Sequence, residues 1–307
     1  MGNLNGRGQR RSVWSVLCAL VLLAGCTGAD QTNTAHADSS AAALAGAVEA
    51  QPQDSVIVEE TLARARAQRL DTLPIGRIVA SLGRTFVGAP YVPGTLELEG
   101  PERLIVNLRE FDCVTFVESM LAMARVLRSG NGGYHAFQQE LLRIRYRNGE
   151  LSGYPSRLHY FSEWLADNQA KDIVQIITPE LGGEADHEPI NFMSQHVSAY
   201  RQLSDTAALT EVVATERRLS ATPRYVIPEN QIAAVANRIQ DGDVIAAAST
   251  LPGLDVAHTG VALWVDGRLH LMHAPLVGKA VEISQLPLAE RIQSIEKQDG
   301  IMVARPK

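Results

Sequence analysis

Helical and strand-type segments occupy different parts of this 307-residue chain. Apolar residues recur every three to four positions through the first two thirds, as in Ile75, Ile78, Val79 and Leu82 after Pro74. Strand-type runs gather mostly near the end, where Asp266-Gly267 between two of them predicts a tight hairpin. A helical part followed by an antiparallel sheet indicates the α+β class.

The same patterns give approximate positions for the main elements. Further helices are expected at 112–128, 134–146, 158–169, 190–200, 205–220 and 229–239. Strands are expected at 173–177, 243–248, 256–265, 268–273, 281–284 and 301–304.

Residues 1–25 have the layout of a secretory signal. Three arginines and no acidic residue precede the apolar run 13–24, which is shorter than the roughly 20 residues needed to span a bilayer. The following Leu23-Ala24-Gly25-Cys26 resembles a bacterial lipobox, so Cys26 is expected to carry lipid. Because Thr27 rather than Asp follows it, the expected location is the periplasmic face of the outer membrane. An unmodified thiol after an ordinary cleavage site is the alternative.

Residues 26–54 are rich in Ala, Thr, Ser and Asp and contain almost no large apolar side chains. They are therefore expected to form a flexible tether, and residues 55–307 to form one folded domain. Loss of the signal would lower the formal charge from −6 to −9. Such an acidic chain, without a basic cluster, has no electrostatic basis for binding nucleic acid.

The chain has three cysteines, too few and too scattered for a disulfide framework. Cys18 would leave with the signal and Cys26 would be lipidated, so Cys113 remains as the free thiol. Asp112 is a good helix-capping residue, which places Cys113 in the first turn of a helix. That position favours the thiolate. A buried structural thiol is the alternative.

Two histidines lie on the two predicted strands of the late hairpin, namely His258 and His273. A thiolate nucleophile needs an imidazole base and a group that orients the imidazole. His258 is the expected base, and His273 or His270 the third group, since alternation places these two on opposite faces. A zinc site made by one cysteine and two histidines is the alternative.

These segments together resemble the NlpC-type superfamily of papain-like cysteine peptidases and amidases. The matching segments are Gly88-Ala89-Pro90-Tyr91, Phe111-Asp112-Cys113, Gly242-Asp243-Val244-Ile245, His258-Thr259-Gly260-Val261-Ala262 and His273-Ala274-Pro275. Asn107 to Glu118, Gly153 to Phe161 and Gly253 to Gly260 further resemble a branch understood as N-acetylmuramoyl-L-alanine amidases. Two departures from the superfamily pattern fit this branch: Val114-Thr115 after the cysteine, and a helical insert at about 130–225.

The resemblance implies a papain-like fold that packs a cysteine-bearing helix on the sheet, and hydrolysis of muropeptides without a cofactor or metal. It selects His273 over His270 as the third catalytic residue, with Cys113 and His258. It also implies substrate contacts for Tyr91 and Asp112, whose alternatives are ordinary packing and a helix cap.

Two residues of the branch-specific loop, Ser156 and Arg157, are further substrate candidates, and a structural ion pair is the alternative for Arg157. The other histidines are expected to be surface or core residues; they are His36, His135, His159, His187 and His196.

Three other functions remain open from the sequence. The same scaffold supports an endopeptidase that cuts within the stem peptide. An acyltransferase would pass the thioester to an acceptor other than water. A catalytically silent lipoprotein that only binds peptidoglycan is the alternative from a different class.

Overall fold

The computed structural model describes residues 47–130 and 132–307. The expected signal, Cys26 with its expected lipidation, and residues 26–46 of the expected tether lie outside the described residues. Residues 47–307 form one compact unit. Within the described ranges, no helix combines the length and hydropathy required to cross a membrane.

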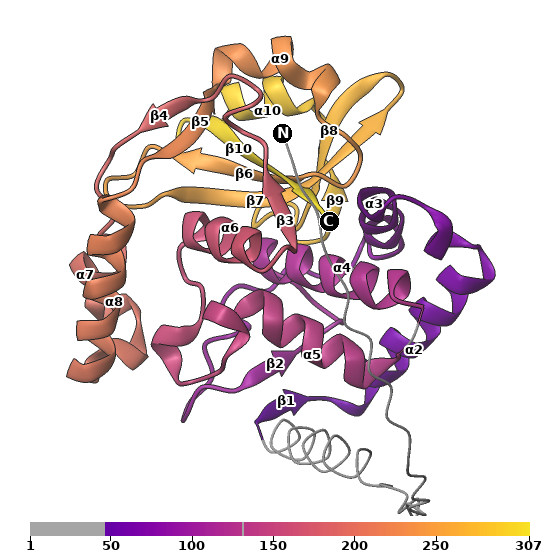
Figure 1. The fold of residues 1–307 in the computed structure, drawn as a ribbon, viewed down its shortest axis with the longest axis horizontal. Helices are drawn as coiled ribbons and strands as arrows, with labels where there is room; N and C mark the ends of the chain where they lie inside the picture. The colour runs from indigo at the N-terminus through magenta and orange to yellow at the C-terminus, as the bar shows by residue number, and fades with distance from the viewer. Residues whose placement is uncertain (1–46, 131) are drawn as a thin grey trace, which may run out of the picture. The chain divides into compact units, whose positions relative to one another are not determined.

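The helical part comes first and most of the sheet follows, as expected for the α+β class (Figure 1). The helices are α2 (Pro52–Ala67), α3 (Ile75–Thr85), α4 (Cys113–Arg128), α5 (Tyr134–Arg145), α6 (Phe161–Ala170), α7 (Phe192–Gln195), α8 (Thr206–Ser220), α9 (Ile232–Val235) and α10 (Leu288–Gln293). The strands are β1 (Val48–Ala50), β2 (Leu104–Val106), β3 (Val174–Ile176), β4 (Glu184–Asp186), β5 (Arg224–Pro228), β6 (Val244–Ser249), β7 (Val256–Val265), β8 (Arg268–His273), β9 (Glu282–Ile283) and β10 (Gln298–Pro306).

One large sheet forms the centre of the described chain. Its strand order is β4-β5-β10-β6-β7-β8-β9, and β3 also pairs with β10. Every pairing in this sheet is antiparallel. The predicted hairpin joins β7 to β8, where Asp266 and Gly267 have φ angles of 47° and 77°. Two consecutive positive φ angles are typical of a type I′ turn, which explains the Asp-Gly pair.

Helices cover both faces of the sheet (Figure 1). Helices α3 and α4 pack against β7 on one side. On the other side, Ile232 of α9 and Leu288 and Ile292 of α10 join a buried apolar cluster with Ile245 of β6 and Leu271 of β8. Burial of these side chains on both faces supplies the main driving force for this arrangement.

Helix α4 lies at the centre of the helical layer and is buried almost all round. The one-sided periodicity predicted a helix with one apolar face, but nearly every side chain from Thr115 to Leu127 is buried. The reason is that α4 is enclosed by α3, α5 and the sheet. Its rigid packing fixes the position of Cys113 at its first turn.

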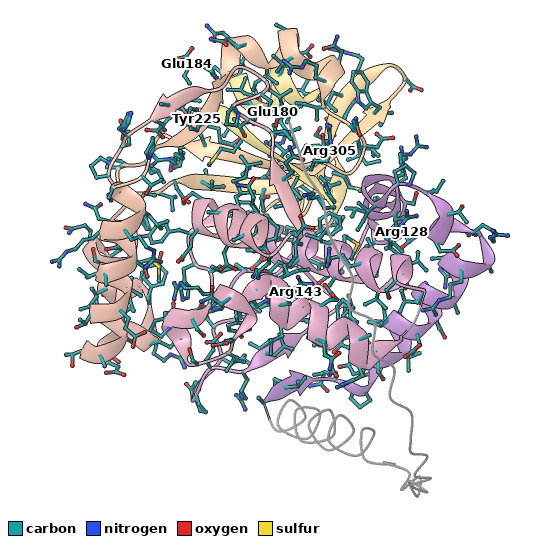
Figure 2. The ribbon with its side chains drawn as sticks, in the orientation of Figure 1. Arg128, Arg143, Glu180, Glu184, Tyr225 and Arg305 are labelled. Carbon is teal, nitrogen blue, oxygen red and sulfur yellow. The ribbon has the colours of Figure 1, made fainter. Side chains whose placement is uncertain are left out.

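A close backbone contact joins α3 to the start of β6. A Cβ added at Gly242 would fall 1.9 Å from the carbonyl oxygen of Gly76, so a side chain does not fit at Gly242. The next residue, Asp243, is buried and accepts hydrogen bonds from Nε and Nη2 of Arg305 at 3.0 and 2.8 Å. Figure 2 labels Arg305 on the last strand. The Gly-Asp segment therefore holds β6 against α3 and β10.

The expected boundary of the tether at residue 54 is too late. Strand β1 and the start of α2 lie before it, and Asp54 is fully buried. Its carboxylate accepts hydrogen bonds from the backbone N–H of Leu108 at 2.9 Å and from Arg109 at 3.2 Å. The low apolar content of 47–54 concealed this contact, because a buried carboxylate rather than an apolar side chain anchors the segment.

The expected helical insert at 130–225 is only partly helical. It contains α5 to α8, but β3, β4 and the first residues of β5 also lie in it and belong to the large sheet. The predicted helices at 190–200 and 229–239 are short: α7 and α9 each span four residues and are accompanied by single 3₁₀ turns.

Candidate active site

Cys113 is the first residue of α4, and the residue before it caps the helix. Asp112 Oδ1 accepts a hydrogen bond from the backbone N–H of Thr115 at 2.8 Å, while the Asp112 N–H donates to Thr115 Oγ1 at 2.9 Å. This reciprocal pair satisfies two backbone donors at the helix start. It confirms the expected capping by Asp112 and fixes the direction in which the chain enters α4.

The thiol of Cys113 is half-buried and faces backbone N–H groups. Burial, followed by the negative charge of Asp112, raises the pKa of Cys113 to about 12, although the backbone N–H groups of Thr259, Cys113 and Val114 act in the opposite direction. The expectation that the helix start would favour the thiolate is therefore wrong for the free protein. The helix N-terminus does lower the pKa, but desolvation outweighs it.

The structure brings His258 and His273 together. Nε2 of His258 lies 2.7 Å from Nδ1 of His273, and the two rings meet edge to face at an interplanar angle of 86°. His270 points elsewhere, because its Nδ1 lies 2.8 Å from the carbonyl oxygen of Ser284. The His-Ala segment thus identifies the histidine that contacts His258.

Both paired histidines are uncharged at neutral pH. Burial, then the positive charge of Arg291 on α10, lowers the pKa of His258 to about 3. Burial, then the neighbouring His258 and Arg291, lowers the pKa of His273 to about 2. Cys113 and His258 therefore enter any reaction as a neutral thiol and a neutral imidazole.

The contact between the two rings determines which nitrogen of each ring carries the proton if His258 acts as a base. If His258 is to accept a proton at its free Nδ1, its own proton must lie on Nε2 and point to Nδ1 of His273. The proton of His273 then lies on its Nε2, which is buried and has no hydrogen-bond partner among the described residues. The nearby acceptor is Glu282 Oε1, at 3.7 Å.

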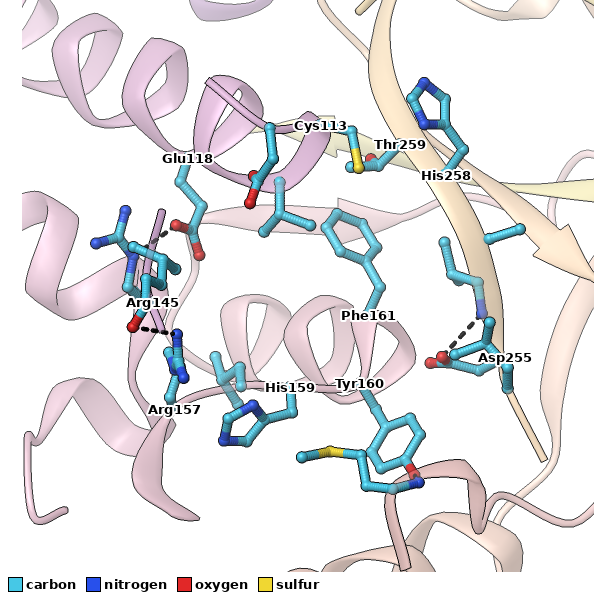
Figure 3. Close-up of a pocket in the computed structure, with 18 of the residues that line it drawn as sticks. Cys113, Glu118, Arg145, Arg157, His159, Tyr160, Phe161, Asp255, His258 and Thr259 are labelled. Carbon is cyan, nitrogen blue, oxygen red and sulfur yellow. Dashed lines mark hydrogen bonds and ion pairs between the residues drawn. The ribbon is translucent and has the colours of Figure 1, made fainter. Parts of the chain in front are cut away.

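A cavity of about 260 Å³ opens beside Cys113 (Figure 3). Cys113 and His258 both line it and flank Thr259 in the view. Aromatic residues form part of the wall, and several charged residues also reach it; the titratable members are Glu97, Asp112, Cys113, Glu118, Arg145, Arg157, His159, Tyr160, Tyr200, Asp255 and His258. The cavity is large enough for one residue or one sugar ring of a larger substrate.

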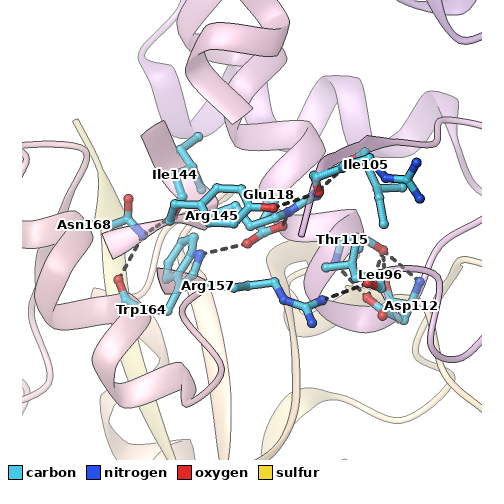
Figure 4. Close-up of polar contacts among 12 residues, drawn as sticks. Leu96, Ile105, Asp112, Thr115, Glu118, Ile144, Arg145, Arg157, Trp164 and Asn168 are labelled. Carbon is cyan, nitrogen blue, oxygen red and sulfur yellow. Dashed lines mark hydrogen bonds and ion pairs between the residues drawn. The ribbon is translucent and has the colours of Figure 1, made fainter. Parts of the chain in front are cut away.

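Arg157 lines the cavity, but its guanidinium is already paired (Figure 4). Nη2 lies 2.6 Å from Glu97 Oε1, Nε lies 3.3 Å from Glu102 Oε1, and Nη1 donates to the carbonyl oxygen of Leu96. The guanidinium also lies 4.9 Å from the centre of the Tyr154 ring. The structural ion pair, which was the alternative for Arg157, is what the geometry shows.

Ser156 and Tyr91 are not among the cavity-lining residues. Ser156 is buried in its own turn, where Oγ donates to the carbonyl oxygen of Gly153 at 2.6 Å and accepts from the N–H of Ser152. Tyr91 is close enough to the thiol that burial, then the charges of Cys113 and Asp112, raise the pKa of its hydroxyl. Tyr91 thus borders the site, whereas Ser156 supports the loop.

A buried ion pair reaches the wall of the cavity, and no sequence pattern predicted it. Arg145 Nε lies 2.7 Å from Glu118 Oε2, and both side chains are 2% exposed. Trp164 Nε1 donates to Glu118 Oε1 at 3.2 Å, and Arg145 Nη1 donates to the carbonyl oxygen of Ile105. Every charge in the pair is thus hydrogen-bonded, as burial requires.

Two further cavity residues were not predicted as site residues. Asp255 is buried and accepts hydrogen bonds from the backbone N–H groups of Ser162 and Val256. His159 was expected to be a surface or core residue, yet it lines the cavity. Its place in the branch-specific loop next to Arg157 was the available signal.

The residues described here offer no metal-ligand set: nowhere among 47–130 and 132–307 do three His, Cys, Asp or Glu side chains gather in a suitable arrangement. Cys113, His258 and His273 therefore do not form the cluster that the zinc alternative needs.

Known proteins share this architecture. One solved structure is an N-acetylmuramoyl-L-alanine amidase from Bacteroides uniformis, 35% identical with a TM-score of 0.73, where the match covers 76% of this chain and 99% of that one. Another is a protein described as a putative xylanase from Bacteroides fragilis, 34% identical with a TM-score of 0.70, covering 74% of this chain and 99% of that one. A Legionella pneumophila protein, 19% identical with a TM-score of 0.61 over 87% of this chain and 96% of that one, shares the fold.

A search of curated proteins gave no match. The family model described as AmiA-like, N-acetylmuramoyl-L-alanine amidase-like, matches residues 81–301, which is well over half of the chain. This chain therefore belongs to the AmiA-like family of amidase-like cell-wall hydrolases.

Proposed function

We propose that this protein hydrolyses the amide bond between N-acetylmuramic acid and L-alanine in muropeptides, with Cys113 as the nucleophile. Family membership supports the substrate class and the amide bond. The proposal that Cys113 is the nucleophile rests on its position at the start of α4, in the same cavity as His258. The order of cysteine helix, His258 strand and His273 strand also supports a papain-like, NlpC-type fold.

The reaction starts from the neutral pair. Nδ1 of His258 accepts the thiol proton as Sγ of Cys113 bonds to the lactyl carbonyl carbon. The carbonyl oxygen takes up the negative charge, and the backbone N–H groups around Sγ are in position to donate to it. The carbon–nitrogen bond then breaks, the protonated His258 gives its proton to the amine of L-alanine, and a thioester remains on Cys113.

Water completes the cycle. His258 accepts a proton from a water molecule, whose oxygen bonds to the thioester carbon. The carbon–sulfur bond breaks, the proton returns to the sulfur, and N-acetylmuramic acid leaves with a free carboxyl group. His273 keeps the His258 ring in place throughout, because its Nδ1 accepts a hydrogen bond from Nε2–H of His258.

The direct test is mass spectrometry of purified muropeptides after incubation with the wild type, Cys113→Ala and Ser156→Ala. We expect the wild type and Ser156→Ala to release a free peptide that begins with L-alanine, and Cys113→Ala to release none. Cleavage only within the peptide would establish the endopeptidase instead. A product joined to an added amine would indicate an acyltransferase, and turnover by Cys113→Ala would refute the thiol nucleophile.

We also propose that Cys26 carries the lipid and holds the protein at the periplasmic face of the outer membrane. The Leu-Ala-Gly-Cys segment and the Thr at position 27 support this location. Metabolic labelling with a fatty acid, followed by membrane separation, tests it. The full chain should be labelled and sediment with outer membranes, whereas Cys26→Ala should lose both properties.

A further inference from the structure

The imidazole of His159 is held in one tautomer by a backbone contact. Its Nε2 lies 2.9 Å from the carbonyl oxygen of Tyr154. Since a carbonyl oxygen only accepts hydrogen bonds, Nε2 must carry the ring proton. The ring also packs on the Tyr154 ring, with 4.3 Å between their centres. This leaves Nδ1 as an acceptor.

The acceptor atom is available to a ligand. Among the described residues, no hydrogen bond to Nδ1 of His159 is formed, while the ring lines the cavity that Cys113 shares. Figure 3 shows the ring in the cavity wall between Arg157 and Tyr160. Burial, then the positive charge of Arg157, lowers the pKa of His159 to about 3, so the lone pair persists at neutral pH.

The charges around His159 determine which groups fit beside it. Two cations line the cavity, Arg145 and Arg157, and both are committed to carboxylates of the protein. Four carboxylates also reach the cavity; they are Glu97, Asp112, Glu118 and Asp255. A carboxylate of the substrate would be desolvated there without a free cation, which is costly. An uncharged N–H or O–H group would instead find an acceptor.

We propose that His159 is a specificity-determining residue, whose Nδ1 accepts a hydrogen bond from an uncharged N–H or O–H group of the muropeptide while the surrounding cavity excludes its carboxylates. This rests on the proposed function only for the identity of the substrate. Two parts of that substrate supply such donors: the hydroxyl and acetamido groups of the sugar, and the amide N–H groups of the peptide.

Binding to the inactive Cys113→Ala protein tests the proposal without turnover. The probes are the methyl amide of N-acetylmuramic acid, which carries the sugar without a carboxylate, and the free stem peptide. Nitrogen-15 NMR of the His159 ring should show a protonated Nε2 and a bare Nδ1. We expect the Nδ1 resonance to shift on addition of the probe that supplies the donor, which distinguishes the two sources. An unchanged Nδ1 with both probes would overturn the proposal.

Matched substitutions add a kinetic test. His159→Asn places a carbonyl oxygen near the position of Nδ1, whereas His159→Gln places its amide near the position of Nε2, where it can donate to Tyr154 but puts no acceptor at the position of Nδ1. Because a neutral hydrogen bond contributes about 1 kcal/mol, we expect His159→Gln to raise KM about five- to tenfold with little change in kcat, and His159→Asn to restore most of the affinity. Equal KM values for the wild type and a folded His159→Gln would refute the role.

The two proposals fail in different ways. Muropeptides cut only within the peptide would refute the proposed function, yet the Nδ1 shift and the KM pattern would still identify the hydrogen bond to His159. Conversely, suppose that the enzyme releases a peptide that begins with L-alanine and that His159→Gln has the same KM as the wild type. The proposed function would then stand, and the specificity role of His159 would be refuted.

Discussion

Nε2 of His258 and Nδ1 of His273 lie 2.7 Å apart, so one hydrogen bond joins the half-buried ring of His258 to the buried ring of His273. This contact orients the imidazole of His258, which lines the same cavity as Cys113. Because each neutral ring already carries one proton, adding a further proton to the pair is opposed by burial and, once one ring is charged, by repulsion between the rings.

Replacing His273 should slow the chemical step rather than weaken substrate binding. We expect His273→Ala to lower kcat by about 100-fold or more, because His258 loses the acceptor that fixes its tautomer. His273→Asn, whose carbonyl oxygen lies near the position of Nδ1, should retain much more activity. Steady-state kinetics on a muropeptide measure both. His270→Ala is the control, since that ring contacts Ser284 and not His258; a larger loss in His270→Ala than in His273→Ala would contradict the assignment.

The stability of the protein should decrease in mild acid. The folded pKa of His159 is about 3, below the ordinary value near 6.5, so the unfolded chain binds more protons between these two values. The free energy of unfolding therefore rises with pH in this window, and falls as pH drops below about 6.5, by up to ~1.4 kcal/mol per pH unit for this group. The His258–His273 pair acts in the same direction.

Urea unfolding at a series of pH values between 7 and 4 measures that slope. The unfolding free energy of His159→Gln should depend less on pH than that of the wild type, by up to one proton. An identical slope in the wild type and His159→Gln would show that His159 is not protonated on unfolding in this range.

The thiol should react slowly near neutral pH. Since burial and Asp112 raise the pKa of Cys113 to about 12, alkylation by iodoacetamide should accelerate about tenfold per pH unit from pH 6 to 10, without a plateau. Asp112→Asn removes the negative charge and still caps a helix, so it should increase the alkylation rate at a fixed pH. A rate that is constant from pH 5 to 8 would instead indicate a preformed thiolate–imidazolium pair.

Removing one partner of the Glu118–Arg145 ion pair should destabilise the protein much more than replacing both partners. Glu118→Gln leaves Arg145 as an uncompensated buried charge, which should lower the free energy of unfolding by about 3–5 kcal/mol. The double substitution Glu118→Met with Arg145→Met should be far less destabilising than the single one. Chemical denaturation of the wild type, Glu118→Gln and the double variant measures this, and a double variant less stable than Glu118→Gln would contradict the dependence of the two charges on each other.

Local features were the most predictable from the sequence. The start of α4 at Cys113 follows from Asp112, and the turn between β7 and β8 follows from the two residues that tolerate positive φ. Each depends on neighbours within a few positions. The identity of the second histidine came from the His-Ala segment, and the 2.7 Å contact with His258 agrees with it.

Features that depend on distant residues were not predictable. Glu118 and Arg145 pair across 27 positions, and β5 reaches the sheet only because β10 offers it an edge. The raised pKa of Cys113 is of the same kind: the helix start is visible in the sequence, but the desolvation that outweighs it depends on how the surrounding elements pack.

The contact of Asp54 with Leu108 links the beginning of the described chain to the helix that begins at Cys113. Strand β1 runs parallel to β2, and five residues after Leu108 the chain reaches Cys113. A pulling force on the N-terminal end would therefore be transmitted to the segment from Leu108 to Cys113, which positions the thiol. A chain truncated to begin at residue 55 would lose β1 and the Asp54 carboxylate together, and the entry to α4 would be released from its outer support.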